Sequence, residues 1–172
     1  KIVFVAVPQS GTPQAIGGLL HGFDQGIPYD WFYPFLSPKT ARQLAENMSS
    51  AYNLLPSEAY FNGEGSEVST PVISLDSGSL TQPFIDKYGD KIKDFDELQN
   101  FLADDVGKVS ADSNNIENPS VLNHSLIDYG KNTHEAIDNS WTISPSILVY
   151  QIAGFGEETL GTVRYWTGTE CI

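Results

Sequence analysis

Residues 1–16 read KIVFVAVPQSGTPQAI, and this stretch decides the fold. Residues 2–7 form an apolar run rich in Val, which is typical of a strand buried on both faces of a parallel sheet. Pro8, Gly11 and Pro13 follow this run, and they predict a turn between the strand and the start of a helix. A strand of this kind needs neighbours, so we expect the chain to open in the middle of a larger sheet.

A second apolar run predicts another strand at residues 146–153, in which Ile147, Leu148, Val149 and Ile152 are apolar. The segment between the two strands is far longer than the few tens of residues of an ordinary crossover, so it must be an insertion with packing of its own. We therefore predict an α/β fold with two parallel strands joined by a long, mainly helical insertion.

This organisation divides one compact unit into three parts. Residues 1–16 are the first strand and its turn, residues 17–145 are the helical insertion, and residues 146–172 hold the second strand and a hairpin-like end. We found no internal repeat and no low-complexity tract in any of the three parts.

Helix starts inside the insertion are marked by capping residues. Ser37 followed by Pro38 predicts an N-cap, and the stripe behind it is expected to face the core: Ala41, Leu44, Ala45 and Met48. Asp94 predicts a second start, with an apolar stripe formed by Phe95, Leu98, Phe101 and Leu102.

Three further elements are predicted in the insertion. The longest helix is expected to begin near Pro119, with His134 at the border of a stripe formed by Leu122, Leu126, Tyr129 and Ile137. A shorter helix is expected around residues 82–88 and a short strand at residues 72–75, and residues 62–79 and 108–118 otherwise read as loops or short extended pieces.

Charge and composition exclude several kinds of partner. The formal net charge is -13, and only nine Lys and Arg residues are present, so a nucleic acid or an anionic membrane surface is not expected as a partner. No apolar run approaches the roughly 20 residues of a membrane-spanning helix. The single cysteine, Cys171, excludes an internal disulfide and a multi-cysteine metal site.

The histidines do not suggest a metal site either. No pair among His21, His124 and His134 has the spacing that places two ligands on one helical face. We therefore expect each to have a structural role, and we predict no metal and no cofactor.

The segment of residues 22–36 is the best candidate for a ligand-facing surface. Its rings alternate with Pro28 and Pro34, and rigid rings on a constrained backbone suit contact with an acyl chain or another apolar ligand. The candidate substrate-binding residues are Phe23, Tyr29, Trp31, Phe32, Tyr33 and Phe35. The alternative is that these rings fill the core of the insertion.

Several motifs in order resemble one family. The chain resembles α/β-hydrolases of the lipase, esterase and lecithin:cholesterol acyltransferase-like branch. The resemblance lies in the turn of residues 8–13, the segments of residues 36–42 and 50–57 with Tyr60 and Phe61, and the strand of residues 147–154. Gln9 departs from the family's turn, which has His there. The resemblance implies that residues 17–145 are the cap or lid over the active site.

The resemblance also implies a Ser-His-acid triad, which this chain does not supply from local motifs. No Gly-x-Ser-x-Gly is present, and Ser10 lacks the first glycine. In the family the nucleophile precedes the first strand, and the acid and the histidine follow the second. We therefore assign no catalytic residue and expect a fragment of a longer lipase- or esterase-like protein acting on lipid-like acyl esters, inactive by itself.

A second hypothesis remains open beside the hydrolase fragment. The chain would be a self-contained, non-catalytic binding domain that uses the aromatic segment of residues 22–36. The fragment reading predicts a nucleophile motif upstream and an acid and a histidine downstream, whereas the binding domain predicts a linker or a signal sequence. The fragment reading further expects association through exposed strand edges, for example as a homodimer.

Overall fold

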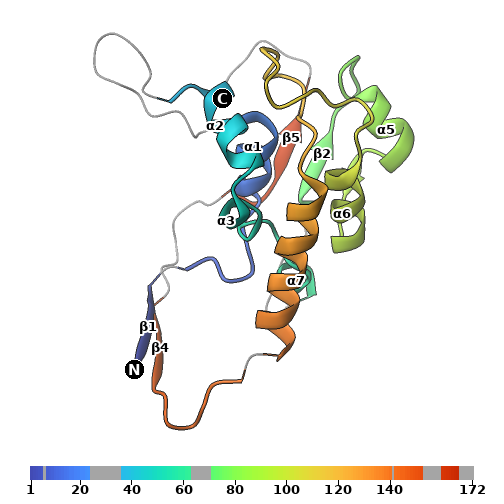
Figure 1. Cartoon of the computed structure of the whole chain (residues 1–172). Helices are drawn as coiled ribbons and strands as arrows, with labels where there is room; N and C mark the ends of the chain where they lie inside the picture. The colour runs from blue at the N-terminus through green and yellow to red at the C-terminus, as the bar shows by residue number, and fades with distance from the viewer. Residues whose placement is uncertain (6, 24–35, 63–70, 141, 153–159, 167–172) are drawn as a thin grey trace.

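Two short parallel strands form a ribbon. The structure, a computed structural model, describes residues 1–5, 7–23, 36–62, 71–140, 142–152 and 160–166. Strand β1 (Ile2–Val5) pairs with β4 (Val149–Ile152) in parallel, with Val3 opposite Tyr150. The predicted α/β class and the parallel pairing of these two strands are confirmed. Figure 1 shows this ribbon at one end of the molecule, away from the helices.

The ribbon is not buried on both faces, as the apolar runs led us to expect. Val3, Val5, Tyr150 and Ile152 share one face, and their exposed fractions lie between 47% and 60%. Within the described chain β1 pairs only with β4. The ammonium of Lys1 lies over the Tyr150 ring, and this face stays about half exposed. The strand expectation is right in its pairing and wrong in its burial.

A second sheet lies within the helical body. β2 (Ile73–Leu75) is central, with β3 (Lys91–Ile92) antiparallel on one side and β5 (Val163–Tyr165) parallel on the other. The end of the chain was expected to be hairpin-like. Instead, β5 pairs with β2 and not with β4 among the described residues. This pairing joins the end of the described chain to the middle of the insertion.

Seven helices complete the described part of the chain. They are α1 (Gln14–His21), α2 (Pro38–Glu46), α3 (Ser49–Tyr52), α4 (Glu58–Asn62), α5 (Gln82–Tyr88), α6 (Phe95–Ala103) and α7 (His124–Ser140). The predicted caps are present, because Ser37 accepts the backbone N–H of Thr40 and Asp94 accepts that of Glu97. The helix at residues 82–88 and the strand near residues 72–75 are also confirmed.

The hydrophobic core lies in this body, between the second sheet and α1, α3, α5, α6 and α7. Its fully buried members include Ile16, Leu20, Ile73, Ile92 and Phe101. The stripe predicted for α6 is largely correct, since Leu98, Phe101 and Leu102 are buried.

Two other predicted stripes are right only in part, since Ala41, Ala45, Leu122 and Leu126 are buried or packed against the core. Leu44 on α2 is 55% exposed, and Met48, which caps the start of α3, is 52% exposed, while Arg42 on α2 is fully buried. The buried side of α2 includes Arg42, because its guanidinium donates to backbone carbonyls of residues 111–118. Helix α2 ends at Glu46, and the short helix α3 begins at Ser49.

The longest helix begins at His124 and not near Pro119. Leu122 is buried, but it lies in the extended approach to α7, and Tyr129 and Ile137 are about half exposed. The buried side of α7 carries Ile127 and His134 instead. Its register is set by the close approach of Gly130 to the backbone of α3, where a side chain would collide with a carbonyl.

The turn of residues 8–13 positions α1 against the loop after α3. Gly11 has φ of 86°, and a Cβ atom there would lie 2.1 Å from the carbonyl oxygen of Leu55. Only glycine fits this approach, because other residues would be strained and would collide. The backbone bonds of Thr12 to Leu54 and of Ser57 to Ser10 hold the contact.

Candidate functional site

Phe23 is exposed at the end of α1. The helix ends at Gly22, whose φ is 67° and whose N–H bonds the carbonyl of Gly18. This left-handed ending turns Phe23 back over Gly17, where it lies on the helix surface and is 60% exposed. An exposed ring held by a fixed helix end can contact an apolar ligand.

The other rings proposed to bind substrate are Tyr29, Trp31, Phe32, Tyr33 and Phe35. They lie outside the described residues. The structure therefore places only Phe23 of the predicted set.

An apolar groove of about 210 Å³ lies on the same helix. It is lined by α1, α2, α3 and the turn before α1, with Leu19, Ala45 and Leu54 among its walls. Leu44 of α2 and Met48 at the start of α3 are also exposed. Together these residues form an apolar surface across α1–α3, which the sequence missed because it placed the stripe of α2 in the core.

His21 is fixed by two hydrogen bonds. Its Nδ1 lies 2.7 Å from the carbonyl oxygen of Ile116 and its Nε2 lies 2.8 Å from the hydroxyl of Tyr165. A carbonyl can only accept, so Nδ1 donates and the Tyr165 hydroxyl donates to Nε2. Burial lowers the pKa of His21, and the bond to Ile116 opposes that shift. Burial raises the pKa of Tyr165.

His124 and His134 are also bonded within the body. His124 Nε2 lies 3.2 Å from a carboxylate oxygen of Asp105. His134 Nε2 donates to the carbonyl oxygen of Asn53 at 2.9 Å. None of the three histidines bonds a serine hydroxyl in the part of the chain that the structure describes. Each of the three therefore has at least one polar contact within the described residues.

Two serines, Ser10 and Ser57, meet where the turn before α1 contacts the start of α4. The carbonyl of Ser10 accepts from the backbone N–H of Ser57, which joins the turn before α1 to the start of α4. The hydroxyl of Ser57 is buried and makes no hydrogen bond among the described residues. A nucleophilic serine needs a base in contact, and Ser57 has none here.

Arg42 is the largest buried group that sequence reasoning missed. The only hint was the adjacent Asn- and Ser-rich segment at residues 110–118, whose carbonyls have few partners in regular structure. Such carbonyls require hydrogen-bond donors, but the sequence does not show which residue donates to them.

Across the described ranges, no group of three or more His, Cys, Asp and Glu side chains could hold a metal ion. Over the same residues, no helix combines the length and the apolar character needed to cross a membrane.

Comparison with known proteins gives one match. The family model described as lecithin:cholesterol acyltransferase matches residues 1–171. Comparison with curated proteins and with solved structures found no significant match. The family match spans the β1–β4 ribbon and the helical body alike, so both are parts of one family unit.

Proposed function

The chain belongs to the lecithin:cholesterol acyltransferase family, and from that membership we propose that it forms the cap and two sheet strands of an enzyme acting on lipid esters. The family indicates a lipase- or acyltransferase-type activity on such esters. In this proposal, residues 1–172 are inactive alone, because the nucleophile, the base and the acid lie elsewhere in the natural protein. The cap shapes the acyl site and excludes water from it.

The observation that carries this proposal is the exposed ribbon. Parallel strands are almost always covered on both faces, and a pair of strands alone is marginally stable in water. Here Val3 and Val5 lie beside Tyr150 and Ile152 on a half-exposed face, and the other face carries Ile2, Phe4, Val149 and Gln151. An apolar parallel pair of this kind suits the interior of a larger sheet.

The apolar surface across α1–α3 supports a role in binding an acyl group. Phe23 at the end of α1 is exposed, and the groove of about 210 Å³ has the size of a short piece of chain rather than of a whole lipid. We propose that Phe23, together with the aromatic residues of segment 24–35, contacts the acyl chain.

A second candidate function rests on the same exposed ring. The chain would be a non-catalytic domain that binds an apolar ligand through Phe23 and segment 24–35, with no hydrolysis anywhere in the natural protein. In the isolated 172-residue chain, self-association through the edges of the ribbon, for example as a homodimer, would accompany either function.

The proposal is tested by polar substitutions on the ribbon. The double variant Val5→Thr with Ile152→Thr is compared with the wild type in the natural protein and in the 172-residue chain. We expect lost lipid-ester hydrolysis in the natural protein and an unchanged thermal midpoint in the chain, because the face is covered only in the former.

The matched control replaces two exposed apolar residues of the helical body, Leu80→Thr with Val106→Thr, which are 44% and 51% exposed. This control is expected to keep activity in the natural protein. Full activity of the ribbon variant would overturn the proposal, and a natural protein that binds apolar ligands without any hydrolysis would favour the binding domain.

A further inference from the structure

The last turn of α1 is bonded to a distant part of the chain. Ser120 is fully buried, and its backbone N–H donates to the carbonyl oxygen of Leu20 at 2.9 Å. Its hydroxyl donates to the carbonyl oxygen of Leu19 at 3.3 Å. These carbonyls belong to the end of the helix, where no further turn supplies a donor. Ser120 therefore fixes the end of α1 against the segment that follows the loop of residues 111–118.

His21 adds two hydrogen bonds at the same helix end, and they reach two different elements. Its Nδ1 donates to the carbonyl oxygen of Ile116 at 2.7 Å, and its Nε2 lies 2.8 Å from the Tyr165 hydroxyl on β5. The centres of the His21 and Tyr165 rings are 5.3 Å apart. Both nitrogens of the imidazole are bonded, so the last residue of α1 cannot turn without losing both bonds.

Gly22 then sets the direction in which the chain leaves the helix. Its φ is 67°, and a Cβ atom there would lie 1.9 Å from the carbonyl oxygen of Pro38, so only glycine fits. The backbone N–H of Phe23 donates to the carbonyl oxygen of Gly17 at 3.2 Å. The Phe23 ring follows this fixed path and lies over Gly17.

The Phe23 ring is exposed although the backbone that carries it is firmly bonded. A ring that is 60% exposed contributes little to the stability of the fold, because burial is what makes an aromatic side chain stabilising. Ordering a contact residue before the ligand arrives does strengthen binding, because the entropy cost is already met in the free protein. The bonds at the end of α1 therefore suit a ring that is held ready for a ligand.

We propose that His21 is a positioning residue for the acyl chain of the ester. Through Gly22 it holds Phe23 where the chain passes along α1, and it does not touch the chain itself because both of its nitrogens are bonded within the body. This inference rests on the proposed function, from which it takes the contact between Phe23 and the acyl chain. It adds the residue that makes this contact rigid.

The role of His21 gives a distinct kinetic signature. Phe23 contacts the acyl chain away from the reacting carbonyl, so losing its position weakens ground-state and transition-state binding alike and raises KM with kcat unchanged. A short acyl group does not reach Phe23, so hydrolysis of a short-chain ester is unaffected. The two measurements therefore separate a positioning role from general damage to the enzyme.

The test measures kinetics of the natural protein with p-nitrophenyl dodecanoate and p-nitrophenyl acetate. His21→Ala removes both bonds, and it is expected to raise KM for the dodecanoate about fivefold, with kcat and acetate hydrolysis unchanged. His21→Gln is expected to restore the wild-type KM, because its amide can donate to Ile116 and accept from Tyr165. Tyr165→Phe removes one hydroxyl only and is expected to raise KM about twofold, so it tests the inference even where His21→Ala does not fold.

A double-mutant cycle shows whether His21 acts through Phe23. Phe23→Ala is expected to raise KM for the dodecanoate about fivefold or more. Adding His21→Ala to Phe23→Ala is expected to give no further rise, because the ring that His21 positions is then absent. Additive effects of the two substitutions would contradict the inference.

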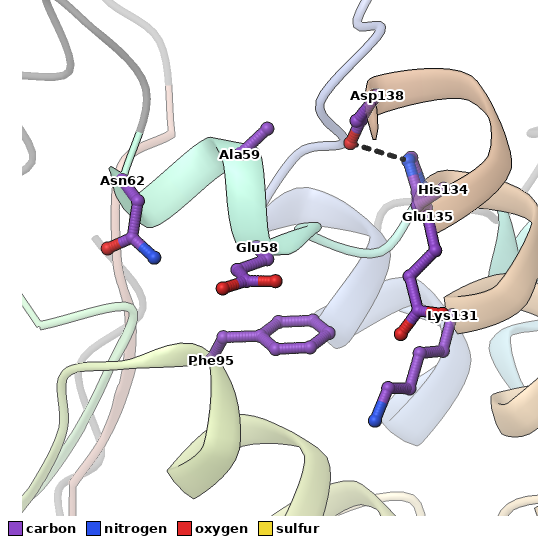
Figure 2. A pocket seen from close by; sticks show the side chains of 8 residues that line it. All are labelled: Glu58, Ala59, Asn62, Phe95, Lys131, His134, Glu135 and Asp138. Atoms are coloured by element: carbon purple, nitrogen blue, oxygen red, sulfur yellow. Dashed lines mark ion pairs between the residues drawn. The ribbon is translucent and has the colours of Figure 1, made fainter. Parts of the chain in front are cut away.

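The matched control is His134→Ala. It removes another buried imidazole that bonds a backbone carbonyl, that of Asn53 at 2.9 Å. His134 lines a pocket of about 370 Å³ whose walls come from α4, α6 and α7, as Figure 2 shows. We expect this control to lower the thermal midpoint of the 172-residue chain, as His21→Ala does, and to leave KM for both esters unchanged.

Two further results would overturn the inference alone. They are a wild-type KM of His21→Ala for the dodecanoate and an equal loss of activity on the acetate. A natural protein that hydrolyses neither ester would contradict the proposed function and this inference with it. The two failures are therefore distinguishable, because only the second abolishes hydrolysis by the wild type.

Discussion

At the scale of single residues, one buried cation organises a loop. Arg42 is fully buried, and its guanidinium donates to the carbonyl oxygens of Ala111, Ser113, Asn115 and Asn118 at 2.7 to 3.4 Å. Such a fork of donors is specific to arginine, because lysine has one nitrogen where arginine has three. The segment from Ala111 to Asn118 has no helix or strand of its own, so these bonds fix its path.

Replacing this guanidinium should therefore be costly. We predict that Arg42→Lys lowers the free energy of unfolding by about 2 kcal/mol, because several buried carbonyls lose a charged donor. Urea unfolding followed by circular dichroism measures the change. The control is Arg164→Lys at the exposed ion pair with Asp76, which should have almost no effect. Equal effects of the two substitutions would show that Arg42 does not hold the loop.

His21 makes the stability depend on pH. Burial lowers the pKa of His21 in the folded chain below its ordinary value of 6.5. The unfolded chain therefore binds more protons just below pH 6.5, so stability is fully present above that pH and falls as the pH drops toward the folded-state pKa. The slope for one proton is at most about 1.4 kcal/mol per pH unit.

We predict that the free energy of unfolding falls between about pH 7.5 and about pH 5.5, and that His21→Gln reduces this fall. Gln keeps a donor for Ile116 and an acceptor for Tyr165 but does not titrate. Urea unfolding at the two pH values measures the difference between the proteins. An equal fall in both proteins would assign the pH dependence to other groups.

At the scale of elements, capping signals were more reliable than apolar stripes. Ser37 and Asp94 start their helices as predicted, because a cap is a local bond between a side chain and the next turn. The buried side of a helix depends instead on distant partners. Arg42 lies on the buried side of α2, and Gly130 lies on the side of α7 that contacts α3. Leu44 and Ile137 are therefore exposed, although they follow the helical period.

The cap of α6 gives a prediction at this scale. Asp94→Ala removes the carboxylate that accepts the N–H of Glu97, and we expect it to lower the free energy of unfolding by about 1 kcal/mol. The matched control, Asp96→Ala, removes an acid of the first turn that caps nothing, so its effect should be clearly smaller. Thermal unfolding of both variants provides the comparison, and a larger loss for Asp96→Ala would contradict the assigned cap.

At the scale of the whole molecule, the sequence predicted the pairing of the two outer strands but not the position of the core. The apolar runs near Val3 and Val149 indicated parallel strands, and they do pair. The core forms elsewhere, around a sheet in which β5 pairs with β2. That pairing joins residues far apart in sequence through very short strands, and no local pattern encodes it.

The candidate site was predictable only in part, for the same reason. A cluster of aromatic residues is visible in a sequence, and Phe23 is exposed as a ligand contact requires. The pocket between α4, α6 and α7 joins Glu58, Phe95 and His134 from three helices, and only the packing of those helices brings them together.

The central claim is that this chain forms the cap and two strands of a lipid-ester enzyme whose catalytic residues lie elsewhere in the natural protein. Labelling with a fluorophosphonate, followed by mass spectrometry of the labelled peptide, tests it most directly, because the reagent modifies an activated serine. The account predicts that the 172-residue chain stays unlabelled and that the natural protein is labelled on a serine outside it. Labelling of Ser10, Ser57 or any other serine within the chain would contradict the account.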